Sequence, residues 1–116
     1  MKLNEKLIPE KFVSIIEKGN NYIKCSDGAL ISFGTVSVGQ ISAGSEKRIS
    51  VSLSQSYVDS NYCVLLTKKG TGGYWTYVME SVISRTTSGF VISTWNNANN
   101  TANLEGMDYY AIGKWK

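Results

Sequence analysis

The 116-residue sequence contains no histidine and only one proline. Without histidine, the chain lacks the commonest general base near neutral pH, the commonest metal ligand and every catalytic triad that depends on imidazole. Charge is also sparse, because 12 Lys and Arg against 9 Asp and Glu give a net charge of +3. The only adjacent basic residues are Lys47-Arg48 and Lys68-Lys69. We therefore do not expect a nucleic-acid-binding protein, whose basic residues cluster.

Long apolar runs and cysteine motifs are missing as well. No run approaches the roughly 18 residues that a membrane-spanning helix needs, so membrane insertion is not expected. The first residues do not resemble a signal peptide, and we expect a chain made in the cytoplasm. Cys25 and Cys63 form no CxxC motif, so they are predicted to be buried, reduced thiols and not a zinc site or a disulfide. No cofactor and no metal site are predicted.

Serine, threonine, asparagine and glycine are abundant, and they alternate with Val, Ile, Tyr and Trp. This composition is typical of twisted antiparallel sheets. The alternation is cleanest in residues 48–54, where Ile49, Val51 and Leu53 should face the core and the intervening serines should face solvent. Further strands are predicted at 22–25, 29–33, 62–68, 74–84, 89–95 and 109–116. The sequence therefore predicts an all-β protein, an antiparallel β-sandwich of six or seven strands.

The N-terminal residues follow a different pattern and predict a short helix from Pro9 to Gly19. Proline suits the first helical turn, and glycine suits the residue after the last. Phe12, Ile15 and Ile16 would share one face of this helix. Because about ten residues cannot hold a helix alone in water, that face should dock on the sheet or on another chain. Two parts are therefore predicted: an N-terminal helical segment, 1–21, and a β-sandwich domain, 22–116.

Few acidic residues are available for catalysis. Glu80 could pair with Glu105 or Asp108 as the acid–base couple of a glycosidase, but a solvated acid on an exposed face is the simpler interpretation. The sequence has no Gly-x-Ser-x-Gly motif, no phosphate-binding Gly-x-x-x-x-Gly-Lys motif and no dinucleotide fingerprint. We therefore predict that the protein is not an enzyme.

Aromatic and amide side chains meet at two loops. A glycine-rich hairpin loop is predicted at 69–73, next to the aromatic residues Tyr74, Trp75 and Tyr77. An asparagine-rich loop, which Trp95 precedes, is predicted at 96–106. Aromatic faces pack on the C–H surfaces of sugars, and amides satisfy sugar hydroxyls. The alternatives are that Trp75 and Trp95 belong to the core or to a subunit interface, and that the asparagine run is a solvated loop. The candidate ligand-binding residues are Tyr74, Trp75, Trp95, Asn97 and Asn100.

Three segments resemble a known family when they are taken in order. They are 21–34, with the pattern Tyr-Ile-Lys-x-x-Asp-Gly-x-Leu-Ile-x-Phe-Gly, then 88–92, Ser-Gly-Phe-Val-Ile, and 109–115, Tyr-Tyr-Ala-Ile-Gly-Lys-Trp. Together they resemble the C-terminal tip domain of bacteriophage and prophage tail fibres. The segments 49–53 and 62–66 also fit the middle of that pattern. These motifs belong to the framework, so no binding residue is carried over from the family.

The resemblance implies a β-sandwich related to H-type lectins that assembles as a homotrimer about a fibre axis. It implies a place in the virion tail, with other tail or baseplate proteins as partners. At its distal end such a tip binds a cell-surface polysaccharide, a teichoic acid or a protein of the bacterial host. The chain would be an excised tip or a short accessory fibre protein. The alternative function is a purely structural fibre cap or baseplate connector without its own receptor. In a trimer, the apolar helix face would pack on the axis; otherwise the helix would fold against its own sheet.

Overall fold

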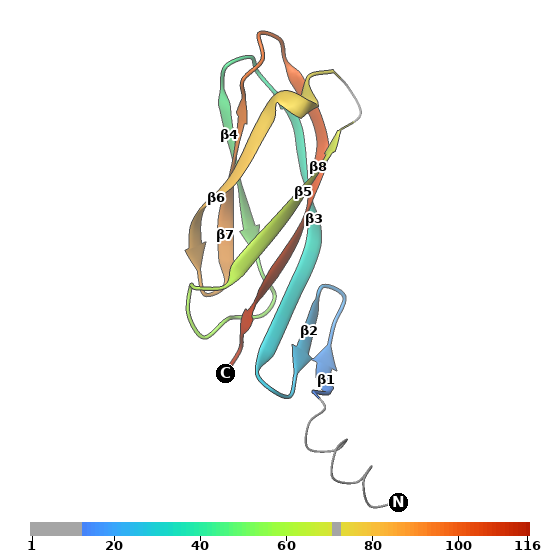
Figure 1. Ribbon diagram of the computed structural model, residues 1–116, viewed down its shortest axis with the longest axis vertical. Coiled ribbons are helices and arrows are strands. Elements are labelled where there is room, and N and C mark those ends of the chain that lie inside the picture. The colour runs from blue at the N-terminus through green and yellow to red at the C-terminus, as the bar shows by residue number, and fades with distance from the viewer. Residues whose placement is uncertain (1–12, 71–72) are drawn as a thin grey trace, which may run out of the picture.

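The computed structural model describes residues 13–70 and 73–116, whose strands form two packed antiparallel sheets (Figure 1). One sheet has five strands in the order β1-β2-β3-β8-β5, and the other has three in the order β4-β7-β6. The described strands are β1 (Ile15–Lys18), β2 (Tyr22–Cys25), β3 (Ala29–Ile41), β4 (Glu46–Ser52), β5 (Cys63–Gly70), β6 (Val78–Thr86), β7 (Gly89–Asn96) and β8 (Ala102–Lys114). This arrangement confirms the predicted all-β protein with two antiparallel sheets, but the described residues form eight strands and not the six or seven expected.

Alternating side chains fill the space between the two sheets. In β8, Met107, Tyr109 and Ala111 point into the core, and the intervening residues point outward. In β7, Phe90 and Ile92 face them from the other sheet, and the rings of Phe90 and Tyr109 meet edge to face at 5.3 Å. The alternation predicted for 48–54 is also confirmed, since its apolar residues pack in the core and its serines are exposed.

Two lysines join the edges of the sandwich. Lys68 of β5 donates from Nζ to the carbonyl oxygen of Val78 in β6, at 2.6 Å. On the opposite side, Lys47 of β4 donates to the carbonyl oxygen of Val38 in β3. Both bonds run between strands that belong to different sheets. Each ammonium group therefore satisfies a carbonyl where the edges of the two sheets come together.

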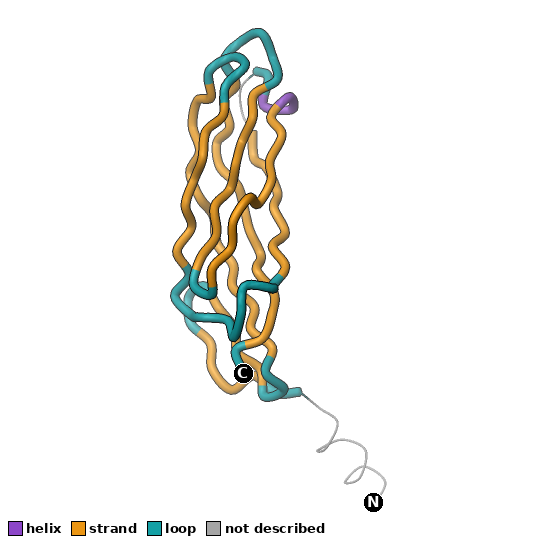
Figure 2. The backbone as a smooth tube through the Cα atoms, turned by 90° about the vertical axis from the view of Figure 1, so that its left-hand side faces the viewer, coloured by secondary structure: helices purple, strands orange, loops and turns teal. Residues whose placement is uncertain are grey.

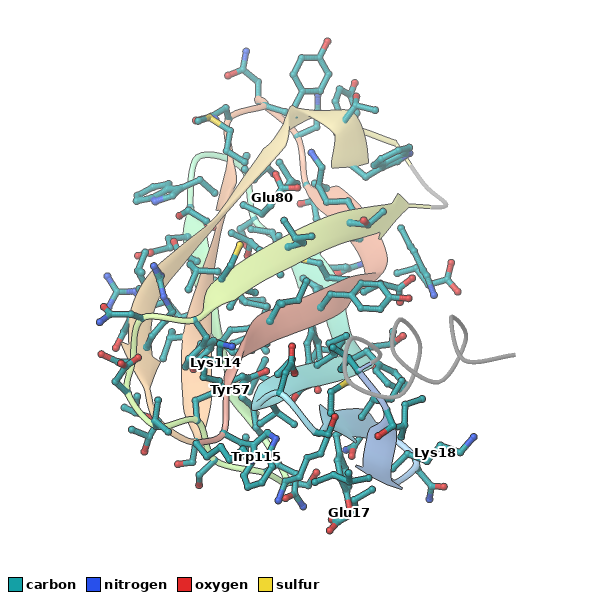
Figure 3. All side chains as sticks on the ribbon, turned by 60° about the horizontal axis from the view of Figure 1, so that its bottom comes forward. Glu17, Lys18, Tyr57, Glu80, Lys114 and Trp115 are labelled. Atoms are coloured by element: carbon teal, nitrogen blue, oxygen red, sulfur yellow. The ribbon has the colours of Figure 1, made fainter. Side chains whose placement is uncertain are left out.

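The long connection from β4 to β5 carries two buried tyrosines whose rings stack at 4.2 Å, Tyr57 and Tyr62. Tyr57 Oη donates to the carbonyl oxygen of Ala111 at 2.6 Å, and Tyr62 Oη donates to that of Gly89 at 2.5 Å. Burial raises the pKa of both phenols. Because the two carbonyls lie on strands of different sheets, the tyrosine pair ties the connection to both of them. Figure 3 shows Tyr57 near Lys114 and Trp115, toward the C-terminal end of the sandwich.

The predicted N-terminal helix is wrong for the residues that the structure describes. Residues 15–18 form strand β1, which pairs antiparallel with β2. The Gly19 N–H donates to the carbonyl oxygen of Tyr22 at 3.0 Å, so the predicted helix stop lies in a hairpin turn. The first part of the predicted helix, with Phe12, lies outside the described residues. The reason for the error is tertiary: an edge of the sheet offers backbone hydrogen bonds that a short helix with no docked face cannot match. The division of the chain at residue 21 stays a prediction.

Three smaller expectations also need correction. The asparagine-rich loop is shorter than predicted, because β8 already begins at residue 102, where buried Ala102 and Leu104 resume the alternation. The glycine-rich segment after β5 joins the two sheets and is not a hairpin loop. Both cysteines are unpaired, but Cys63 is exposed and Cys25 is only partly buried, so the predicted burial is wrong.

Over the described residues, no helix is long and apolar enough to cross a membrane.

Candidate functional site

The described loops that carry most of the predicted site lie at one end of the sandwich. The turn from β7 to β8 and the short 3-10 helix η1 (Trp75–Tyr77) lie at the end opposite to the C-terminus and the β1–β2 hairpin, as Figures 1 and 2 show. Loops at the end of a rigid sandwich are a common place for recognition. We call this the loop end of the molecule.

A buried side chain organises the asparagine-rich turn. Asn96 is the last residue of β7 and is 0 % exposed. Its Nδ2 donates to the carbonyl oxygens of Ile41 at 2.9 Å and Asn100 at 2.8 Å, and its Oδ1 accepts from the Ala98 N–H at 2.9 Å. The turn is therefore fixed from inside by one amide, and the asparagines that follow can point to the surface.

Opposite this turn, the chain enters η1 through a backbone conformation that is unusual for a residue with a side chain. Tyr74 has φ 65° and ψ 3°, in the left-handed region. Its ring lies 6.0 Å from that of Tyr77 in a tilted pair. The two tyrosines face the asparagine-rich turn across a pocket of about 230 Å³. The pocket is lined by Tyr74, Tyr77, Asn97, Ala98, Asn99 and Asn100.

The structure brings three of the five predicted site residues together and separates the other two. Tyr74, Asn97 and Asn100 line the pocket. Trp75 instead packs partly buried against the core, where its ring covers Gly70 so closely that a Cβ there would lie 2.0 Å from Trp75 Cγ. Trp95 lies on the outer face of the three-stranded sheet and is 46 % exposed. Whether these residues bind a ligand stays a prediction.

Sequence reasoning did not select two further residues that line the pocket, Tyr77 and Asn99. Tyr77 is 57 % exposed, and it was expected inside a strand and not in a helical turn. Its spacing of three residues from Tyr74 was the available signal, since one turn of 3-10 helix places residues three apart on the same side. Asn99 could not be told apart from its asparagine neighbours, because only the buried amide of Asn96 decides which of them point outward.

Next to Trp95, an acidic residue is held in a charge pair. Glu46 lies directly opposite Trp95 in the β4–β7 pairing. Its carboxylate accepts hydrogen bonds from Ser93 Oγ and from Arg48 Nε, the latter at 3.0 Å. The bond from Ser93, and then Arg48, lower the pKa of the Glu46 carboxyl. Glu46 is therefore ionised and neutralised locally, with an aromatic ring as its cross-strand neighbour.

Two of the acids considered for a glycosidase couple, Glu80 and Asp108, lie beside lysines. Glu80 lies 3.6 Å from Lys68 Nζ, and Figure 3 shows it between β5 and β6. Asp108 accepts from Thr35 Oγ1 at 2.5 Å and lies 3.0 Å from Lys69 Nζ. The bond from Thr35, and then Lys69, lower the pKa of the Asp108 carboxyl. A general acid in a glycosidase needs a raised pKa, so the environment of Asp108 opposes that role.

The outer face of the five-stranded sheet is apolar over three neighbouring strands. Phe33 of β3, Tyr110 of β8 and Leu65 of β5 lie side by side in the strand register, and the Phe33 and Tyr110 rings are 6.1 Å apart. Ile31, Ile112 and Cys63 form the next row on the same face. Leu65 and Tyr110 are more than half exposed. An exposed apolar patch of this kind is a surface on which another molecule can pack.

Within residues 13–70 and 73–116, no three His, Cys, Asp or Glu side chains gather as a metal site. No protein-family model matches the sequence, and no curated protein matches it. The architecture is a β-sandwich of two packed antiparallel sheets. The chain is similar to an N-truncated R1-type pyocin tail fibre, with a TM-score of 0.71 and 19 % identity over 97 % of this chain and 93 % of that one.

A longer fragment of a tail fibre has the same fold. The chain is similar to a C-terminal fragment of the P. aeruginosa R1 pyocin fibre, with a TM-score of 0.68 and 20 % identity. This match covers 88 % of this chain but only 28 % of that fragment. The chain thus spans less than a third of the longer fragment. At these identities, the two comparisons establish a shared fold.

Proposed function

We propose that the chain is the receptor-binding tip of a phage or prophage tail fibre and recognises a surface glycan of the bacterial host without catalysing a reaction. The observation that carries this proposal is the match to a pyocin tail fibre over 97 % of the chain. In this proposal the protein is part of the virion tail, and other tail or baseplate proteins are its partners. The relation to H-type lectins that the sequence motifs imply is part of the same proposal.

The loop end supports glycan recognition by its position and chemistry. Its pocket combines the two tyrosine rings with asparagine amides, and these groups suit the C–H faces and the hydroxyls of a sugar. It lies at the opposite end of the sandwich from the β1–β2 hairpin, through which the described chain begins (Figure 1). A fibre shaft that precedes this hairpin would therefore present the pocket at the distal end.

The apolar outer face of the five-stranded sheet supports a homotrimer. Strand β1 replaces part of the N-terminal helix whose apolar face was expected to pack on the trimer axis. A trimer would therefore need another apolar surface as the contact between copies. Phe33, Leu65 and Tyr110 provide one in the middle of the sheet. Burying this face between copies removes apolar side chains from water, which is the main driving force of assembly.

The absence of catalysis is part of the proposal and has its own support. Asp108 and Glu46 both have lowered pKa values, and Glu80 is paired with Lys68. A sugar-cleaving acid–base couple needs one carboxyl that stays protonated near neutral pH. These three carboxylates instead contact side chains of neighbouring strands.

Two measurements test the proposal. Light scattering should give a mass near three chains, and Leu65→Glu should reduce it to one chain, whereas Ser81→Glu on the other sheet should not. Tyr77→Ala should abolish adsorption to host cells without changing the melting temperature, with Val58→Ala as an exposed apolar control at the other end of the molecule. Unchanged adsorption by Tyr77→Ala, with a trimer intact, would favour the structural fibre cap.

A further inference from the structure

We propose that the outer face of the three-stranded sheet binds an unbranched, uncharged glycan laid along β7, from the loop-end pocket past Trp95 to a hydroxyl-lined trough. The inference rests on the proposed function and names the ligand class and its extent. It predicts that the protein binds several consecutive sugars of a glycan chain and not a single terminal sugar. The outer face is the side of β4, β7 and β6 that points away from the other sheet.

The strand register makes this face continuous with the loop-end pocket. Met79 and Trp95 are cross-strand partners, and both are exposed. Asn97 lies two residues after Trp95, and Tyr77 lies two residues before Met79. The Asn97 N–H donates to the carbonyl oxygen of Tyr77 at 3.5 Å. This bond places the pocket residues Tyr77 and Asn97 directly beyond the Met79–Trp95 pair, where η1 leads into β6 and where β7 ends. One surface therefore runs from the loop end onto the sheet.

The middle of the face offers an aromatic surface beside polar groups. Trp95 is exposed, and its cross-strand neighbour Glu46 accepts from Arg48. The Arg48 side chain is largely exposed, so its remaining N–H groups are free to reach a ligand. Because the carboxylate and the guanidinium neutralise each other, this part of the face has no net charge. An uncharged sugar matches it better than an acidic one.

The other end of the face is a trough of about 210 Å³. Its lining combines hydroxyl groups with an apolar floor that contains Val91. The lining hydroxyl groups belong to Ser50, Ser52, Ser84, Thr86 and Ser88. None of them is charged, and each hydroxyl can both donate and accept, as sugar hydroxyls require. The trough therefore has the same preference for a neutral glycan as the middle of the face.

The length of the face favours a chain of sugars over a single sugar as the ligand. Gly89 and Asn97 are eight residues apart, which corresponds to about 26 Å along an extended strand at about 3.3 Å per residue. This span accommodates several sugar rings in a row. The opposite sheet differs, because its outer face is apolar and is the proposed contact between copies. The polar face would remain outward in a trimer.

The test uses a series of unbranched neutral oligosaccharides, from monosaccharide to octasaccharide, prepared from a neutral bacterial polysaccharide that the full chain binds on an array. Affinity should rise at least tenfold along the series. Trp95→Ala should lower the affinity for the octasaccharide about tenfold, which is the effect of losing about 1.4 kcal/mol. Ser50→Arg, which places a long side chain in the trough, should do the same. Ser60→Arg, in the exposed loop before β5, is the matched control and should have no effect. The melting temperature and the solution mass of each variant are measured alongside.

The outcomes separate this inference from the function on which it rests. Length-dependent affinity that both face variants reduce supports the inference. Equal affinity for monosaccharide and octasaccharide, with Ser50→Arg silent, overturns it but leaves a glycan-binding tip in place. Binding only to acidic polysaccharides also overturns it. If neither polysaccharides nor host cells are bound, the proposed function fails together with the inference.

Discussion

The buried amide of Asn96 gives the sharpest test of how the loop end is built. Asn96→Ala removes three hydrogen bonds, two to the carbonyl oxygens of Ile41 and Asn100 and one from the N–H of Ala98. A protein hydrogen bond contributes about 1 kcal/mol net, so the free energy of unfolding should fall by about 3 kcal/mol. For a chain of this size, the melting temperature should fall by about 12 °C. Urea denaturation followed by tryptophan fluorescence measures the change.

Asn96→Asp is nearly isosteric and separates hydrogen bonding from packing. It replaces the donating Nδ2 with an oxygen that faces two carbonyl oxygens, so the folded state favours the protonated carboxyl and raises its pKa above the unfolded value of about 3.9. The folded form binds the proton more tightly, so the deficit relative to the native chain should be small at pH 4 and grow as the pH rises toward 7. The opposite trend would contradict the proposed geometry.

Asn97→Ala is the control, because this neighbouring side chain is exposed. Its effect on the free energy of unfolding should stay within about 0.5 kcal/mol. The reasoning fails if Asn96→Ala costs less than about 1 kcal/mol, since the carbonyls of Ile41 and Asn100 would then be satisfied in some other way.

Three further predictions concern the sandwich itself. Removing the Tyr57 hydroxyl with Tyr57→Phe should cost about 1 to 2 kcal/mol in chemical denaturation, because the carbonyl oxygen of Ala111 loses its 2.6 Å donor; no loss would contradict the bond. Lys68→Met keeps the stem but leaves the Val78 carbonyl unsatisfied, and should lower the urea midpoint by an amount equivalent to about 1 to 2 kcal/mol. The Asp108 carboxyl has a lowered pKa, so its contribution to stability is present above the unfolded pKa and is lost as the pH falls through the folded one. Asp108→Asn should therefore show a shallower loss of stability than the native chain between pH 5 and pH 3, in acid titrations followed by circular dichroism.

Local patterns were enough to predict much of the framework. Residues 48–54 alternate so regularly that only one face can be buried, and Val51 is buried as expected. The Asp27-Gly28 turn between β2 and β3 is also decided locally, because Gly28 adopts φ 99° and the Asp27 carboxylate accepts from the Ala29 N–H at 2.9 Å. In both cases the preference is contained within a few neighbouring residues, so no knowledge of distant contacts is needed.

Other features depend on contacts that the sequence does not reveal. The apolar spacing at Ile15 and Ile16 fits a helix, but pairing with β2 decides the conformation, and both side chains remain exposed. In the asparagine-rich turn, only Asn96 is buried, because the carbonyl oxygen of Ile41 comes from another sheet and is 55 residues away. Trp75 and Trp95 differ in burial for the same reason. Trp75 packs on Gly70, whereas Trp95 lies beside its cross-strand neighbours on the outer face.

The two outer faces of the sandwich have opposite chemistry, and this difference links assembly to recognition. Phe33, Leu65 and Tyr110 make the five-stranded sheet a surface that copies of the chain can bury. The outer face of the three-stranded sheet carries serines beside the exposed Trp95 and Met79 and is the more polar of the two. If copies meet through the first face, each presents the second face outward and parallel to the fibre axis. Several glycan chains on one cell could then be held together, and the effective concentration of the remaining faces would make weak single contacts sufficient. A monomeric Leu65→Glu variant should therefore keep its affinity for a soluble oligosaccharide and lose its attachment to cells.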